Sequence, residues 1–151
     1  MRRKLPIVLV RLIVGLVFLV EGLLKFILPN ELGEGRFALI GLPFPHVLAP
    51  LVGGIEILGG IAVILNLYAG DAALLLLCVI VTALVSTKVP ILLGRPWGPF
   101  SLPKTAHYGL LAFLHEARTD LAMLFCTVAI LIDSGLQFGR RRRWYQGGKR
   151  G

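Results

Sequence analysis

Glu21 and Lys25 lie one helical turn apart in the apolar stretch GLVFLVEGLLKF, and further ionisable residues interrupt the later hydrophobic runs. Opposite charges four residues apart face the same side of a helix and interact there. The other charged residues within such runs are Arg11, Glu56, Lys88, Asp120 and Asp133. A charge inside a membrane span costs about 2.5–3.5 kcal/mol on insertion scales, so it usually faces the protein interior or a polar cavity. The chemistry these groups favour is ligand binding or proton transfer within a membrane.

Depth along the helices divides these residues into two groups. At a rise of about 1.5 Å per residue, five of them fall in the outer half or near the middle of a helical bundle. They predict one ligand-binding or proton-handling pocket, formed by Glu21, Lys25, Glu56, Lys88 and Asp120. Arg11 and Asp133 share a depth nearer the inner face and predict an ion pair.

Three interpretations of the charges stay open. They orient the helices, or they form a functional pocket, or single lysines such as Lys25 and Lys88 extend to the membrane surface. The spacing of His46, His107 and His115 fits no metal motif, so no metal site is predicted. There is no phosphate-binding loop and no haem attachment motif, so no cofactor is visible.

Four apolar segments are long enough to hold these residues within a bilayer: about 6–26, 47–67, 72–93 and 119–138. The sequence therefore predicts an all-α integral membrane four-helix bundle over residues 1–139, followed by a basic tail over 140–151. Pro90 is expected to kink or end the third helix. The connection 94–118 is apolar enough in its second part to predict a short interfacial helix.

Composition and charge support a membrane protein. The chain is 56% hydrophobic and 16% charged, with a mean hydropathy of +0.83. Nine of the sixteen lysines and arginines lie at the ends: Arg2, Arg3, Lys4, Arg140, Arg141, Arg142, Arg143, Lys149 and Arg150. By the positive-inside rule this predicts a multi-pass protein of the cell (inner) membrane with both termini cytoplasmic, where the basic ends contact anionic headgroups. Nucleic-acid binding is not expected, since no groove-like pattern accompanies the charge.

Three stretches resemble the DoxX family. They are RLIVGLVFLVEGLLKFILP at residues 11–29, GLPFPHVLAPLVGGIEILGGIAVILNLYAG at 41–70 and RTDLAMLFCTVAILIDSG at 118–135. Lys25 and Glu56 match the family's first two helix signatures best, and Asp120 stands at the acidic position of its last helix. The long 94–118 connection and the Arg140–Arg143 ending depart from the pattern.

The resemblance implies a four-helix membrane protein and suggests a role. Members include small membrane subunits linked to quinone-coupled thiosulfate oxidation and to bacterial oxidative-stress complexes. The function expected from the resemblance is therefore a redox-complex membrane subunit with a protein partner, a bound quinone or lipid as its possible ligand and no visible redox centre of its own. An enzymatic role is left undecided. The alternatives are a non-catalytic scaffold or assembly factor and, less favoured, a small transporter, since no inverted repeat is seen.

Overall fold

The computed structural model describes the backbone of residues 5–147 and the side chains of residues 5–135. Its helices are α1 (Leu5–Ile27), α2 (Glu34–Ile40), α3 (Pro45–Ile64), α4 (Ala69–Ala83), the π-helix η1 (Leu84–Lys88), α5 (Val89–Leu93) and α6 (Leu110–Gly147). Residues 1–4 and 148–151, and the side chains of Arg140–Arg143, lie outside the described part, so the predicted basic ends are not placed.

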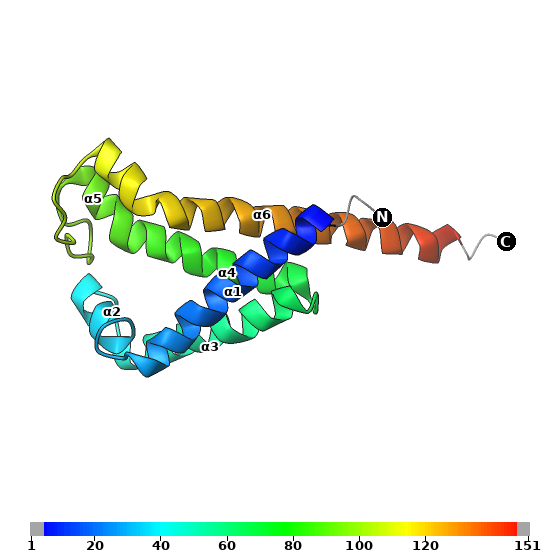
Figure 1. The fold of residues 1–151 in the computed structure, drawn as a ribbon, viewed down its shortest axis with the longest axis horizontal. Helices are drawn as coiled ribbons and strands as arrows, with labels where there is room; N and C mark the ends of the chain where they lie inside the picture. Colours follow the sequence, from blue (N-terminus) through cyan, green and yellow to red (C-terminus); the bar gives the residue numbers. More distant parts are fainter. Residues whose placement is uncertain (1–4, 148–151) are drawn as a thin grey trace.

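The long helices run up and down between two ends of the molecule (Figure 1). At one end α1 begins, the α3–α4 connection turns and α6 passes out, and this is called the terminal end here. The opposite, distal end carries α2, α5 and the connection 94–109. The most extensive helix contacts are between α1 and α3, followed by those between α4 and α6. The bundle is thus two helix pairs joined to each other.

Glycines allow α1 and α3 to pack closely. Gly15 and Gly22 on α1 face Gly60 and Gly53 on α3, in the order expected of antiparallel helices. A Cβ atom added at Gly22 would lie 2.7 Å from the carbonyl oxygen of Gly53, and one at Gly60 would lie 2.7 Å from that of Gly15. Small residues let helix backbones approach in this way inside membranes, where burial of apolar surface does not drive association.

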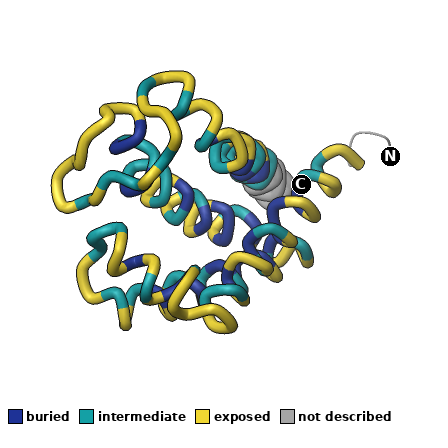
Figure 2. Tube along the Cα trace, turned by 60° about the vertical axis from the view of Figure 1, so that its left-hand side comes forward, coloured by how far each residue is buried: buried dark blue, intermediate teal, exposed yellow. Residues whose placement is uncertain are grey.

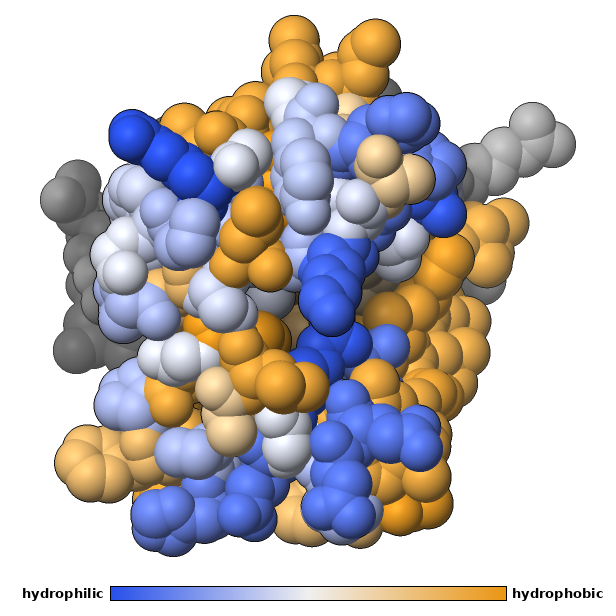
Figure 3. Space-filling view, turned by 90° about the vertical axis from the view of Figure 1, so that its left-hand side faces the viewer, coloured by the Kyte–Doolittle hydropathy of each residue, from blue (hydrophilic) through white to orange (hydrophobic). Residues whose placement is uncertain are grey.

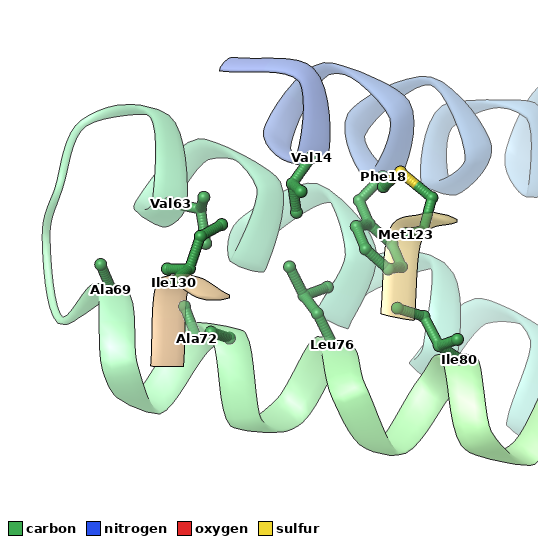
Figure 4. Close-up of a cluster of buried hydrophobic side chains, with 10 residues drawn as sticks. Val14, Phe18, Val63, Ala69, Ala72, Leu76, Ile80, Met123 and Ile130 are labelled. Atoms are coloured by element: carbon green, nitrogen blue, oxygen red, sulfur yellow. The ribbon is translucent and has the colours of Figure 1, made fainter. Parts of the chain in front are cut away.

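The buried apolar core joins all four long helices (Figure 4). Its largest fully buried aliphatic members include Leu76 on α4, Ile130 on α6, Val14 on α1 and Val63 on α3. Val63 and the buried Ala69 flank the α3–α4 turn, so much of this core lies towards the terminal end. Figure 2 shows buried segments on the inward sides of the helices and exposed ones outside.

Three helical stretches are long and apolar enough to cross a membrane: Leu5–Ile27, Pro45–Ile64 and Ala69–Leu93. They correspond to the first three predicted spans. The fourth predicted span, 119–138, lies within α6, but within the described residues α6 is not among the helices that meet those criteria. Large apolar side chains such as Leu16, Leu58 and Leu75 are exposed on the outside, as expected for surfaces that face lipid.

Two local features of the distal half differ in detail from the expectation. The helical part of the 94–118 connection is not a separate helix, because residues 110–118 are the first turns of α6. No Gly or Pro occurs between Leu110 and Ser134 to interrupt that helix. Pro90 does not end the third span, which continues through α5 to Leu93 as predicted; the helix is instead distorted just before Pro90, where the turn becomes η1. Because proline lacks an N–H and crowds the preceding turn, it disfavours α-helical geometry there.

Candidate functional site

Six of the seven charged residues that the sequence places in membrane spans occur in three ion pairs, each of which joins two helical elements. Arg11 on α1 donates a hydrogen bond from its guanidinium to Asp133 on α6, with an N–O distance of 2.8 Å. The Arg11 side chain is 8% exposed and that of Asp133 is 31% exposed. The structure therefore brings together the two residues expected to pair near the inner face.

The second pair lies on the α1–α3 interface. Lys25 Nζ is 2.6 Å from a carboxylate oxygen of Glu56, and the two side chains are 10% and 5% exposed. Gly53 precedes Glu56 by one turn, and a Cβ atom added there would lie 3.4 Å from Lys25 Cβ. The nearest atom to such a Cβ would be Phe26 Cε2, at 2.8 Å, so the absence of a side chain at Gly53 lets the Phe26 ring of α1 pack against α3 beside the ion pair.

The third pair connects η1 with α6 and is looser. Lys88 Nζ is 3.7 Å from a carboxylate oxygen of Asp120, beyond hydrogen-bonding distance, and Asp120 is 34% exposed. Lys88 is the last residue of the π-helix, whose Thr87 hydroxyl donates to the Ala83 carbonyl at 2.6 Å. Single π-helical turns inside α-helices often mark functional positions.

Glu21 differs from the other predicted pocket residues in its exposure and pairing. Its side chain is exposed, and it has no ion pair among the residues that the structure describes. Its backbone carbonyl accepts a hydrogen bond from Lys25 Nζ at 3.4 Å. The remaining four residues form the pairs Lys25–Glu56 and Lys88–Asp120, each between different elements.

A pocket of about 210 Å³ lies at the distal end, beside Lys88. Its polar lining comes from α2, η1, the connection before α6 and α6 itself: Arg36, Thr87, Lys88, Lys104, Thr105 and Glu116. Figure 3 looks onto this end and shows hydrophilic residues gathered around a recess, with hydrophobic side chains along the flank. Of these lining residues, only Lys88 was among the candidates from the sequence.

The connection before α6 reaches α2 and closes one side of this region. The Ser101 amide donates to the Ile40 carbonyl at 2.9 Å, and its hydroxyl donates to the Leu39 carbonyl. Gly41 has a φ of +92° and lies directly against the Pro99 carbonyl oxygen, a contact that a side chain would block. These contacts bring Arg36 near residues some seventy positions later in the chain, which sequence spacing alone does not reveal.

The described residues contain no group of three or more His, Cys, Asp and Glu side chains arranged to hold a metal ion. Cys78 and Cys126 are both free thiols.

Comparisons with known proteins agree with this architecture. The family model for DoxX matches residues 7–89, a stretch that includes Lys25, Glu56 and Lys88. An uncharacterized membrane protein of Mycobacterium tuberculosis is 42% identical over 125 residues, which cover 83% of this chain and 72% of that protein. No solved structure matches the chain.

Proposed function

Because the chain belongs to the DoxX family of membrane proteins, we propose that it is a small membrane subunit of a redox complex, either quinone-linked or acting against oxidative stress. In this proposal the Lys25–Glu56 pair is the centre of a polar intramembrane site for a quinone or a similar lipid-soluble ligand. A protein partner supplies the electrons through its own redox cofactor.

The observation that supports the proposal is the position of the Lys25–Glu56 pair. It is buried between α1 and α3, two apolar helices that the facing glycines already hold in close contact. A buried ion pair is weak evidence for stability, because well-packed apolar residues of similar volume are often as stabilising or more so. The α1–α3 interface therefore does not need this pair for its packing, which favours a chemical role.

The two side chains suit a carbonyl ligand. The Lys25 ammonium donates hydrogen bonds, and the Glu56 carboxylate accepts protons from the ammonium or from a ligand hydroxyl. Reduction of a quinone to a quinol takes up two electrons and two protons. The partner's cofactor would supply the electrons, while Lys25 and Glu56 would hold and pass protons at the ligand's oxygens.

Bound ligand provides the test. The full chain is purified in a mild detergent, its lipids are extracted, and quinone is measured by mass spectrometry. The double variant Lys25→Met/Glu56→Gln removes both charges without leaving either one unpaired. We expect this variant to remain folded but to lose the co-purifying quinone, while the exposed control Glu31→Gln retains it. Equal quinone in all three proteins, or none in the wild type, would contradict the proposal.

A scaffold or assembly factor is the second candidate, and the other two ion pairs favour it. Arg11–Asp133 and Lys88–Asp120 each connect α6 to another element. Ion pairs between helices can fix how the helices are arranged, and Arg11–Asp133 is hydrogen-bonded and lies outside the distal pocket. A scaffold would hold its protein partner without any quinone in the wild type, so the quinone measurement on the wild type separates the two functions.

The proposed orientation places both termini in the cytoplasm and the distal end outside. In a background with Cys78 and Cys126 replaced by alanine, a membrane-impermeant maleimide should label Cys introduced at Glu31 or Ala106. It should not reach Cys introduced at Gly147 in intact cells. The reverse labelling pattern would invert the topology and place the distal pocket on the cytoplasmic side.

A further inference from the structure

The distal pocket gathers more positive than negative charge. Arg36, Lys88 and Lys104 line it, with Glu116 as the only acidic lining residue. Within the part of the chain that the structure describes, Arg36 and Lys104 have neither an ion pair nor a side-chain hydrogen bond, and Lys88 has only the 3.7 Å contact with Asp120. Like charges that converge on a recess repel one another and raise its affinity for an anion.

The neutral groups of the pocket complete its hydrogen-bonding pattern. The Thr87 hydroxyl donates to the Ala83 carbonyl at 2.6 Å, and the Thr105 hydroxyl donates to the His107 carbonyl at 2.7 Å. With their protons committed to the backbone, both hydroxyls can only accept hydrogen bonds from a ligand. Glu116 also only accepts. The pocket therefore presents three cationic donors together with three acceptors.

We propose that the distal pocket binds a phosphate group accompanied by a hydrogen-bond donor. Arg36, Lys88 and Lys104 would contact the anionic oxygens, since guanidinium and ammonium groups form strong charge-assisted bonds to phosphate. Glu116, Thr87 and Thr105 would accept from the donor, which is the P–OH of hydrogen phosphate or a hydroxyl of a phospholipid headgroup. At about 210 Å³ the pocket is smaller than typical sites for drug-sized ligands, so it suits a headgroup-sized ligand.

This site is separate from the proposed quinone site. None of its lining residues is Lys25 or Glu56, so either proposal can fail without the other. Glu116 gives the phosphate proposal a specific signature, because a carboxylate repels an oxoanion unless that ligand donates a hydrogen bond to it. Sulfate has no such proton at neutral pH, so the pocket should discriminate between two anions of similar size.

Calorimetric titration of the full chain in mild detergent at pH 7 tests whether the pocket binds inorganic phosphate from solution. Inorganic phosphate should bind saturably, and sulfate should bind at least about tenfold more weakly. Arg36→Gln and Lys104→Gln should each weaken phosphate binding by about tenfold or more, the effect of losing a charge-assisted hydrogen bond. Both side chains are exposed, so these variants should fold, which circular dichroism can verify. Arg95→Gln, an exposed cation of the same connection that does not line the pocket, should bind phosphate normally.

Glu116→Gln tests the selectivity, and it should reduce the preference for phosphate over sulfate. The lipid source is tested in nanodiscs that contain phosphatidylglycerol, whose headgroup has hydroxyls, or phosphatidylcholine, whose headgroup has none. If a headgroup is the ligand, native mass spectrometry should show phosphatidylglycerol retained by the wild type and lost from Arg36→Gln/Lys104→Gln. Phosphate binding and lipid retention that are both insensitive to Arg36 and Lys104 would overturn the proposal, as would unchanged selectivity in Glu116→Gln.

Discussion

The α1–α3 interface and the contact between η1 and α6 each contain a lysine paired with a carboxylate, but they hold it very differently. On the α1–α3 interface the Lys25–Glu56 distance is 2.6 Å and both side chains are nearly buried. Between η1 and α6 the Lys88–Asp120 distance is 3.7 Å, and the side chains of Lys88 and Asp120 are 14% and 34% exposed. The same two chemical groups are thus held tightly in one region and loosely in the other.

The backbone explains this difference. Glycines bring α1 and α3 close enough for the Lys25 stem to lie against Gly53 and reach Glu56. Near Lys88, the π-helical turn before Pro90 displaces the helix from α geometry, and Lys88 lies at the edge of the distal pocket. Close helix packing fixes an ion pair, whereas a local departure from regular helix leaves a lysine available to a ligand. The two lysines are therefore expected to differ in how strongly stability depends on their partners.

The largest effect is expected from Glu56→Gln. The substitution leaves the Lys25 ammonium without a carboxylate in a nearly buried position, and breaking a buried pair in this way typically costs about 3–5 kcal/mol. The melting temperature of the purified protein, followed by circular dichroism in one detergent, should fall clearly. Adding Lys25→Met should restore it, because the double variant contains no unpaired charge.

The double variant also separates packing from pairing. If Lys25→Met/Glu56→Gln were as unstable as Glu56→Gln alone, the α1–α3 interface would depend on the ion pair itself. Glycine packing alone would then not hold α1 against α3, and the scaffold function would be favoured over the quinone site.

A smaller but clear effect is expected from Gly22→Ala. The new Cβ atom would lie 2.7 Å from the Gly53 carbonyl oxygen, so α1 and α3 must separate. Overpacking of this kind typically costs about 1–3 kcal/mol. Gly54→Ala is the matched control on α3, since a Cβ atom there meets nothing within 4 Å. Thermal unfolding should show Gly22→Ala destabilised and Gly54→Ala unchanged or slightly stabilised, because alanine favours helix over glycine.

Equal stability of those two alanine variants would show that the glycine contacts do not hold α1 against α3. The Lys25–Glu56 pair would then be needed for that interface, and its burial would no longer favour a chemical role.

The sequence predicts those features that depend on a local residue pattern or on depth along a helix. Long apolar runs predicted the helices, and the rise per residue placed Arg11 at the depth of Asp133, with which it pairs. The same reasoning grouped five residues into one pocket; four of them form the pairs Lys25–Glu56 and Lys88–Asp120, and the fifth, Glu21, is exposed. Depth alone does not give the direction in which a side chain points, which depends on how each helix is rotated against its neighbours.

The distal pocket could not be predicted from the sequence, and the reason is physical. Arg36, Lys104 and Glu116 belong to three separate segments, and each is an ordinary polar residue in its own local context. They meet because the connection before α6 folds back onto α2 through hydrogen bonds such as that from the Ser101 amide to the Ile40 carbonyl. Contacts of this type depend on loop conformation, which the periodicity of hydrophobic residues along the chain does not indicate.

The smallest effect is expected from Asp120→Asn, which tests most directly whether the protein holds Lys88 more loosely than Lys25. At 3.7 Å the carboxylate makes no hydrogen bond with Lys88, and its exposure screens the remaining attraction. Lys88 is only 14% exposed, so the pair is partly solvated, and removing the charge should lower the free energy of unfolding by about 1 kcal/mol, the upper end for exposed ion pairs. The variant also frees Lys88 from its only anionic partner among the described residues, so phosphate should bind to the distal pocket at least as tightly as before. Thermal unfolding and calorimetry on the same preparation measure both quantities. A loss of stability as large as that of Glu56→Gln would mean that the two regions hold their lysines alike, and it would make Lys88 a structural residue rather than part of a ligand site.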